Sequence, residues 1–356
     1  MITGVSIKNF KVFKSLEAKG LSRVTLISGR NNCGKTTLLE AIFTLFDRNN
    51  LHNIPHLLNR RGVDQVVLRP EELWAPIFHN YEMKEEIEIS LTKNGERESV
   101  TYRYLDSYPR TIASGPVGET GGVKLIQTGQ SSTYMQALEM NYRLKDNVSF
   151  TSHCFIGPGG LELVAGAMDP QNYPVAILPI DIKTSMGDPE RFGILDIDGK
   201  ADSIMEILKV IEPNLKSLSV VVRGDTKLIY GDVGMGRKIP VLYMGEGLSR
   251  LLTLSLQLAT FGKGTVLVDE IGTGIHHSVL PNVWKALFQA AEEFDCQIIG
   301  TTHSYECIEA AYSAVPPNKL DSFTYIRLAR KGDITIPHVF DYEMMQAALE
   351  SDWEVR

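Results

Sequence analysis

The chain has 356 residues, of which 43% are hydrophobic and 22% are charged, and its formal net charge is −7 at pH 7. These values predict a globular protein of one large or two modest domains, and the charge gives no overall attraction to nucleic acid. No apolar stretch approaches the ~20 residues of a membrane helix, and Met1–Phe10 lacks the layout of a signal peptide. We therefore expect a cytoplasmic protein that has no membrane partner.

The first element with a chemical signature is a phosphate-binding loop. Residues 29–36 read GRNNCGKT and fit the pattern G-x-x-x-x-G-K-[ST] at every fixed position. A buried strand is predicted before them, at 24–28, and a helix with apolar residues at helical spacing after them, at 37–46. This order predicts a nucleoside triphosphate site, because backbone N–H groups and a helix N-terminus surround the phosphates.

Each residue of the loop has an expected role. Lys35 is expected to reach the β- and γ-phosphates, and the Thr36 hydroxyl to ligate Mg²⁺. Cys33 admits two interpretations: a small residue at a small-residue position, which is favoured, or a thiol whose pKa falls at a helix N-terminus. The predicted ATP-binding residues of this segment are Arg30, Asn31, Asn32, Cys33, Gly34, Lys35, Thr36 and Thr37.

Residues 51–235 carry none of these nucleotide signals and predict an inserted lobe of mixed helix and strand. Strands are expected at 86–91, 99–104 and 219–222, a helix at 204–210, and a mobile loop at 114–132, which is rich in Gly, Ser and Thr. The head would then consist of 1–50 and 236–356. The basic clusters Arg60–Arg61 and Lys8, Lys11 and Lys14 are interpreted as solvated surface, with phosphate contact as the alternative.

A second glycine turn opens a predicted helix at 251–258. Gly245, Glu246 and Gly247 precede the helix and form a second anion-binding geometry. Two such helix N-termini in one chain are explained if the second faces the nucleotide of another subunit. These three residues are therefore also predicted to bind ATP.

A predicted strand at 265–268 ends in Asp269 and Glu270, the arrangement of a Walker B strand. Asp269 is expected to order the metal shell, and Glu270 to polarise the water that attacks the γ-phosphate. A turn at 272–276 and a helix from about 278 follow. A further core strand at 296–302 ends at His303, which is placed to contact a γ-phosphate.

As a set, these motifs resemble the ABC-type ATPases of the SMC-like branch, specifically the stand-alone relatives of the overcoming-lysogenization-defect (OLD) family. The resemblance covers residues 7–11, 24–46 and nearly all of 239–356, including Thr301–Cys307 and the ending Trp353–Arg356. It implies an α/β P-loop NTPase head of ABC/SMC-like type, interrupted by the inserted α+β lobe.

The resemblance also implies a homodimer or higher homo-oligomer with ATP at the interface. Gly245–Gly247 would be the signature segment that completes the partner's site, Gly274–His276 the turn that crosses between subunits, and His303 the switch histidine. Three departures stand out: Gly245 replaces a serine of many signatures, 272–274 reads GTG, and the chain ends without room for the family's Toprim nuclease domain. Any nuclease is therefore expected to be a separate partner.

The leading hypothesis is a Mg²⁺-dependent ATPase that dimerises around ATP and controls a separate effector, in particular a nuclease in anti-phage defence. Its catalytic residues would be Lys35, Glu270 and His303, with Thr36 and Asp269 on the metal. A first alternative is a DNA-repair or recombination ATPase acting on ends or gaps, with DNA as a partner. A second is a non-catalytic scaffold that ATP stabilises, which the altered signature motivates.

Overall fold

The computed structural model describes residues 1–46, 69–113, 117–120, 123–126, 130–144, 148–157, 160–165, 173–180 and 187–350. Arg60–Arg61 and Trp353–Arg356, both named above, lie outside these ranges. Within the described ranges, no helix is long and apolar enough to span a membrane.

The centre of the molecule is a six-stranded sheet with the order β11-β15-β16-β3-β17-β18. All neighbours are parallel except β17 and β18, which are antiparallel. Most of its central residues are apolar and buried, as expected for parallel strands covered on both faces. The strands are β3 (Val24–Gly29), β11 (Val175–Leu178), β15 (Thr265–Val268), β16 (Gln297–Thr301), β17 (Phe323–Lys331) and β18 (Ile334–Phe340).

Side chains alternate along the central strands between two hydrophobic cores, because successive residues of a strand point to opposite faces. Leu26, Val266 and Ile298 belong to the core under α6, α7 and α8. Their neighbours Ile27, Leu267 and Ile299 belong to the core around α1. The helices are α1 (Lys35–Phe46), α6 (Glu246–Thr260), α7 (Leu280–Glu293) and α8 (Tyr305–Ser313), and α9 (Tyr342–Glu350) follows β18.

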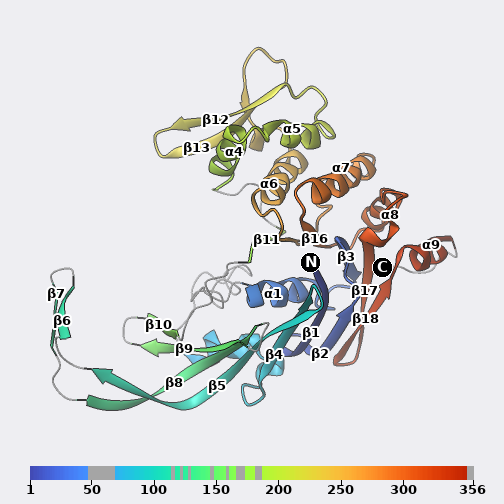
Figure 1. The fold of residues 1–356 in the computed structure, drawn as a ribbon. Helices are drawn as coiled ribbons and strands as arrows, with labels where there is room; N and C mark the ends of the chain where they lie inside the picture. The colour runs from blue at the N-terminus through green and yellow to red at the C-terminus, as the bar shows by residue number, and fades with distance from the viewer. Residues whose placement is uncertain are drawn as a thin grey trace.

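Helix α1 lies between the central sheet and a seven-stranded antiparallel sheet (Figure 1). The order of that second sheet is β10-β9-β8-β5-β4-β1-β2. Both faces of α1 are therefore covered, and its residues from Thr37 to Leu39 are buried. The strands are β1 (Ile2–Phe10), β2 (Phe13–Lys19), β4 (Ile87–Lys93), β5 (Glu96–Ala113), β8 (Gln130–Arg143), β9 (Ser149–Gly157) and β10 (Gly160–Ala165).

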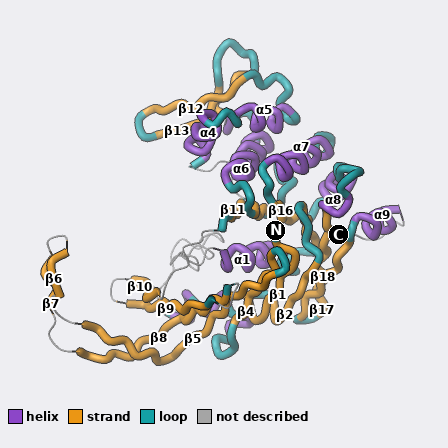
Figure 2. The backbone as a smooth tube through the Cα atoms, in the orientation of Figure 1, coloured by secondary structure: helices purple, strands orange, loops and turns teal. Residues whose placement is uncertain are grey.

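Strands β5 and β8 continue as a two-stranded ribbon beyond the rest of the sheet (Figures 1 and 2). Their pairing reaches Ala113 and Gln130, and a small hairpin of β6 (Val117–Thr120) and β7 (Val123–Ile126) lies between them in the chain. The prediction of a loop at 114–132 was therefore wrong for most of this segment. The Gly, Ser and Thr content favoured a loop, but the antiparallel pairing of β5 with β8 extends into this segment.

A smaller layer covers α6 and α7 on the side away from the central sheet. Helices α4 and α5 contact α6, and α5 also contacts α7. Two strands of this layer, β12 and β13, form an antiparallel pair to which β14 adds a short edge. The elements are α4 (Asp188–Ile197), α5 (Ala201–Lys209), β12 (Ser217–Arg223), β13 (Thr226–Asp232) and β14 (Ile239–Pro240).

The other helices within the described ranges are short: α3 (Pro70–Leu73), η1 (Ala75–Ile77), η2 (His79–Tyr81), η4 (Val241–Tyr243) and η5 (Leu320–Ser322). Both sheets cross the boundaries predicted at 51 and 235. Strand β4 pairs with β1, and β11 pairs with β15. Residues of the range 51–235 therefore complete the head's own sheets, in addition to forming the layer over α6.

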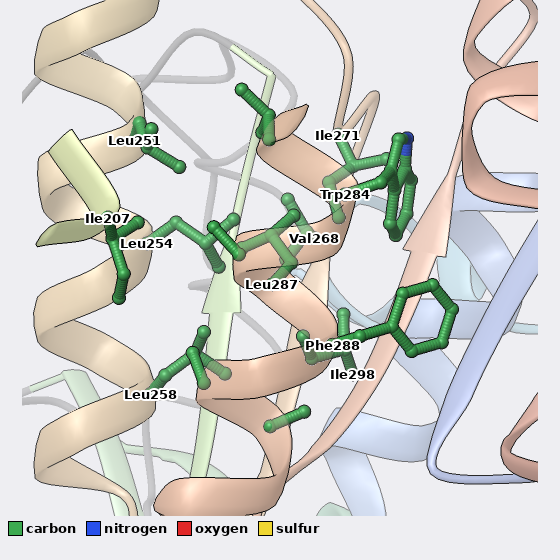
Figure 3. Packing of buried hydrophobic residues seen from close by; sticks show 14 of the residues in the cluster. Ile207, Leu251, Leu254, Leu258, Val268, Ile271, Trp284, Leu287, Phe288 and Ile298 are labelled. Atoms are coloured by element: carbon green, nitrogen blue, oxygen red, sulfur yellow. The ribbon is translucent and has the colours of Figure 1, made fainter. Parts of the chain in front are cut away.

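The packing between α6, α7 and the central sheet holds the motif-bearing segments at fixed positions (Figure 3). Leu251, Leu254 and Leu258 of α6 belong to the same buried cluster as Leu287 and Phe288 of α7. They recur at helical spacing, so one face of α6 is buried along its length. Helix α6, which begins at the glycine turn, thus shares a core with β15, the strand that ends immediately before Asp269.

One link between the two sheets is a buried glutamine, Gln297. The Gln297 side chain at the start of β16 accepts a hydrogen bond from Ile2 N at 2.8 Å and donates to Ile2 O at 2.7 Å and Ser22 O at 2.8 Å. Gln297 is 2% exposed, so water cannot replace these bonds readily. The N-terminal strand is in this way attached to the central sheet at the start of β16.

Replacing Gln297 with Ala is expected to lower the free energy of unfolding by about 3 kcal/mol, because three buried backbone groups lose a partner. Urea denaturation followed by circular dichroism would measure the change. The matched control is Gln346→Ala, where the lost bond to Glu350 is on the surface; its effect should stay within about 0.5 kcal/mol. Equal losses in the free energy of unfolding for the two substitutions would contradict the proposed role of Gln297 as a link between the sheets.

Candidate functional site

The glycine-rich loop connects β3 to α1 and requires glycine at both ends. Gly29 and Gly34 have φ values of 141° and 102°, which strain other residues. A Cβ on Gly34 would also collide with the Phe13 ring and lie 2.8 Å from Val12 Cγ1. Lys35 Nζ donates to Gly29 O at 2.9 Å, so the ammonium group lies over the loop. The loop therefore has a tight conformation that tolerates only glycine at these two positions, with the Lys35 ammonium group against its main chain.

The Asp269 carboxylate lies beside the start of α1. Thr36 Oγ1 donates to Asp269 Oδ2 at 3.0 Å, and Thr301 Oγ1 donates to Asp269 Oδ1 at 2.5 Å. Three segments that are far apart in sequence meet here because the carboxyl ends of parallel strands β15 and β16 share one edge of the sheet with the loop after β3. Thr36 and Asp269 offer a hydroxyl and a carboxylate, the oxygen ligands that Mg²⁺ prefers, so this pair fits the metal.

Glu270 is held in an unusual backbone conformation next to His303. Its φ is 50°, and its N–H donates to Thr301 Oγ1 at 2.9 Å. Glu270 Oε2 accepts hydrogen bonds from His303 Nδ1 at 2.7 Å and from His303 N at 3.2 Å. The Glu270 side chain is 12% exposed and that of His303 is 66% exposed. Among the described residues, the second carboxylate oxygen of Glu270, Oε1, has no hydrogen-bond partner.

Arg250, one turn into α6, fixes the main chain of this acidic pair. Its guanidinium donates to Asp269 O, to Glu270 O at 3.2 Å and to Ile180 O at 2.5 Å. Arg250 is 4% exposed. Charged donors to carbonyl groups form strong hydrogen bonds when buried, so α6 is firmly attached to the end of β15.

These residues surround a cavity of about 710 Å³, which is within the range of small-molecule sites. Its lining includes eight of the residues predicted from the sequence: Asn31, Asn32, Gly34, Lys35, Thr36, Thr37, Asp269 and Glu270. Of the described residues, three further ones line it that the sequence did not single out, namely Val12, Ile180 and Arg330. Arg30 is exposed and His303 is hydrogen-bonded to Glu270, but neither of these two predicted residues is among those that line the cavity.

Cys33 is inside the protein and does not line the cavity. It is 1% exposed, and a Cβ on Gly29 would lie 2.7 Å from its sulfur. Burial raises the pKa of the Cys33 thiol above its ordinary value, and the Lys35 ammonium offsets only part of this rise. The alternative of a thiol with a lowered pKa was therefore wrong. The small-residue interpretation fits the close contact with Gly29.

Gly245, Glu246 and Gly247 lie outside the set of cavity-lining residues. Gly245 has a φ of 118° and begins α6, and a Cβ built on it would meet nothing within 4 Å. Gly247 is buried against the carbonyl of Gly274. The glycine turn before α6 and the turn after Glu270, both predicted to meet a second subunit, are thus in contact with each other.

Two family profiles match the chain. One, described as "AAA ATPase domain", matches residues 1–151, and the other, described as "AAA domain, putative AbiEii toxin, Type IV TA system", matches residues 165–309. The first match includes the glycine-rich loop and the second includes Asp269, Glu270 and His303.

Individual proteins are similar over different lengths. An "ATP/GTP phosphatase" of Helicobacter pylori is 23% identical over 380 residues, which cover 99% of each chain. The "DNA double-strand break repair Rad50 ATPase" of Methanopyrus kandleri is 31% identical over 119 residues, which are 32% of this chain and 13% of that protein. Among solved structures, the "SmcHead bound to the C-winged helix domain of ScpA" is similar with a TM-score of 0.54 at 15% identity, covering 97% of this chain and 99% of that chain.

The similarity to the SMC head concerns the fold, and it agrees with the fold class predicted from the sequence. The two profiles are described as AAA ATPase or AAA domains, and each includes strands of the central sheet. The chain is therefore an ATPase, with the mixed α/β P-loop NTPase fold of the SMC/ABC type.

Proposed function

We propose that this protein is a Mg²⁺-dependent ATP-hydrolysing switch in which two copies close around ATP, and that this cycle controls a separate effector. One observation carries the proposal: the cavity collects the phosphate loop, Asp269 and Glu270 from one chain, whereas Gly245–Gly247 at the start of α6 lie outside the set of residues that line it. This arrangement supports a site that binds and cleaves a triphosphate, and a second anion-binding helix end that serves another subunit.

The proposed roles follow from the contacts. Lys35 and the loop N–H groups hold the β- and γ-phosphates, and Thr36 and Asp269 hold Mg²⁺, which when bound neutralises charge on the phosphate oxygens. Glu270 takes a proton from the attacking water through its free carboxylate oxygen. His303 orients Glu270 through two hydrogen bonds and, being exposed, is able to reach the γ-phosphate as well.

The second copy is proposed because of the geometry at the start of α6. The first N–H groups of a helix have no intrahelical partner, and they attract anions. The N-cap residue of α6, Gly245, supplies no side-chain cap, and a Cβ on it would meet nothing within 4 Å among the described residues. The contact between Gly247 and Gly274 would let the same surface carry both the signature segment and the crossing turn of the dimer.

The experiment is a mass measurement of the Glu270→Gln variant by light scattering with Mg²⁺ and ATP. We expect a monomer without nucleotide and a dimer with ATP, because the amide preserves the shape of the site but cannot accept the proton. Lys35→Ala in the same background should stay monomeric. A monomer at saturating ATP, with binding demonstrated separately, would contradict the dimer. The ATPase assignment does not support the alternative of a non-catalytic scaffold. That alternative would be excluded if the wild type hydrolyses ATP in the steady state and Lys35→Ala does not.

The effector and its setting belong to the proposal as well. The second profile names a putative toxin of a Type IV TA system, which supports a partner or target that the ATP cycle restrains. The resemblance to OLD-family ATPases supports a nuclease in this role and a function in anti-phage defence. Co-purification of the chain with the products of neighbouring genes, followed by mass spectrometry with and without ATP, would identify the effector.

DNA repair is the second candidate, and the match to the Rad50 ATPase of Methanopyrus kandleri favours it. The predicted basic cluster gives it little support. Lys8 pairs with Glu88 at 2.8 Å and Lys11 pairs with Glu40 at 2.9 Å, so two of its three cations are already neutralised. A salt-sensitive affinity for DNA ends that increases with ATP would establish this candidate. No binding at low salt would exclude it.

A further inference from the structure

The main chain after β15 is held in a conformation that glutamate rarely adopts. Glu270 has a φ of 50°, in the left-handed region, which is costly for residues other than glycine. The residues on either side of it are attached to neighbouring strands: Asp269 N donates to Leu178 O of β11 at 2.8 Å, and Ile271 N donates to Thr301 O of β16 at 2.9 Å. The surrounding structure therefore imposes the conformation of Glu270.

The hydroxyl group of Thr301, the last residue of β16, holds the N–H between these two attachments. Glu270 N donates to Thr301 Oγ1 at 2.9 Å, and among the described residues this N–H has no other hydrogen-bond partner. The same hydroxyl donates its one proton to Asp269 Oδ1 at 2.5 Å. Thr301 is 0% exposed, so water does not readily replace either bond.

This hydroxyl connects the acid proposed to hold the metal with the main chain of the proposed base. The other oxygen of Asp269, Oδ2, accepts a hydrogen bond from Thr36 Oγ1 at 3.0 Å. A chain of three hydrogen bonds thus runs from the start of α1 through Asp269 and Thr301 to the N–H of Glu270. A general base acts only within hydrogen-bond reach of its water, and a displacement of about 1 Å lowers a rate by about 100-fold.

We propose that Thr301 is a positioning residue, whose hydroxyl holds the main chain of Glu270 in the conformation that directs its carboxylate at the attacking water. The inference rests on the proposed function and adds a residue that does not touch the substrate. Thr301 is not among the residues that line the cavity, so it acts through Glu270 and Asp269. Without the hydroxyl, the N–H of Glu270 loses its partner and the left-handed conformation loses one of the bonds that impose it.

The test compares Thr301→Val, which keeps the shape of the side chain and removes the hydroxyl, with Thr301→Ser, which keeps the hydroxyl. Phosphate release in a single turnover should be about 100-fold slower in the valine variant and within about threefold of the wild type in the serine variant. The dissociation constant of ATP, measured by fluorescence titration, should stay within about threefold in both, because the loop at 29–36 is unchanged. Wild-type phosphate release by Thr301→Val would overturn the proposal.

The matched control is Thr25→Val in β3. Thr25 is 1% exposed, and its hydroxyl also accepts one backbone N–H and donates one bond: it accepts from Ser22 N at 3.1 Å and donates to Ser22 O at 3.2 Å. Loss of this hydroxyl should lower the urea midpoint of unfolding about as much as Thr301→Val does, and it should leave phosphate release unchanged. Equal slowing in the two valine variants would reduce the effect to a general loss of stability and overturn the positioning role.

A double substitution tests whether Thr301 acts through Glu270. In the Glu270→Gln background the base is already absent, so adding Thr301→Val should change the residual rate by less than about threefold. A further 100-fold loss in that background would show that Thr301 affects hydrolysis by another route, and the proposal would then be wrong.

The outcomes separate this inference from the proposed function. A wild-type protein that binds ATP without hydrolysing it would contradict the ATP-hydrolysing switch. Normal hydrolysis by both the wild type and Thr301→Val would contradict only the positioning role of Thr301.

Discussion

Replacing Glu270 with Gln is expected to lower the rate of ATP hydrolysis by about 10²- to 10⁴-fold, the usual contribution of a positioned general base. The amide keeps the size of the side chain and still accepts a hydrogen bond from His303, so ATP affinity should remain within a few-fold of the wild type. Release of inorganic phosphate under single-turnover conditions measures the chemical step directly, and fluorescence titration measures the affinity.

A suitable control for this substitution is Glu306→Gln. Glu306 is an exposed acid in the first turn of α8, close in sequence to His303, and it bonds the Ser304 hydroxyl at 2.7 Å rather than lining the cavity. Its replacement should leave turnover unchanged. Wild-type hydrolysis by Glu270→Gln would remove Glu270 from the mechanism and leave the water to be activated by another group.

Replacing Gly34 with Ala is expected to weaken ATP binding about 100-fold, the equivalent of about 2.7 kcal/mol. Gly34 has a φ of 102°, and a methyl group on it would meet the ring of Phe13, which is fully buried and cannot move aside. The loop has to shift to accept the methyl group, and its N–H groups then no longer converge on the phosphate. Isothermal titration with ATP and Mg²⁺ would measure the loss.

Gly95→Ala separates backbone strain from the collision. Gly95 lies in the turn between β4 and β5 with a φ of 83°, but a Cβ there meets nothing within 4 Å. The substitution should cost some stability and leave ATP affinity unchanged. Comparable ATP affinities for the Gly34 and Gly95 variants would show that the shape of the loop tolerates a side chain.

The elements around the glycine-rich loop could be predicted because their signals are local. The strand at 24–28, the helix at 37–46 and the strand at 265–268 appear as β3, α1 and β15 with small changes in their ends. Helix α6 begins five residues earlier than its leucine repeat, because Gly247 has a low helix propensity and concealed the first turn. Tertiary contact with Gly274 holds that turn in helical form.

Other features depend on contacts between distant segments. Strand β11 is only four residues long, and its identity as a strand comes from parallel pairing with β15. Arg250 and Arg330 donate hydrogen bonds to backbone carbonyl groups. Every residue has such a carbonyl, so no sequence pattern predicts these bonds. Thr301 could have been found, since it is the last residue of β16 and lies within the core strand predicted at 296–302. The sequence thus located the chemical groups of the site but not the side chains that hold them in place.

The hydrogen bonds of Arg250 have a consequence for how two sites would work together. Arg250 is on the helix proposed to touch the partner's nucleotide, and it bonds the main chain at Asp269 and Glu270 of its own site. A shift of α6 caused by ATP in one site would therefore displace the acidic pair of the other. The rate of hydrolysis should then depend on ATP concentration with a Hill coefficient above one. The two subunits would hydrolyse ATP cooperatively rather than independently.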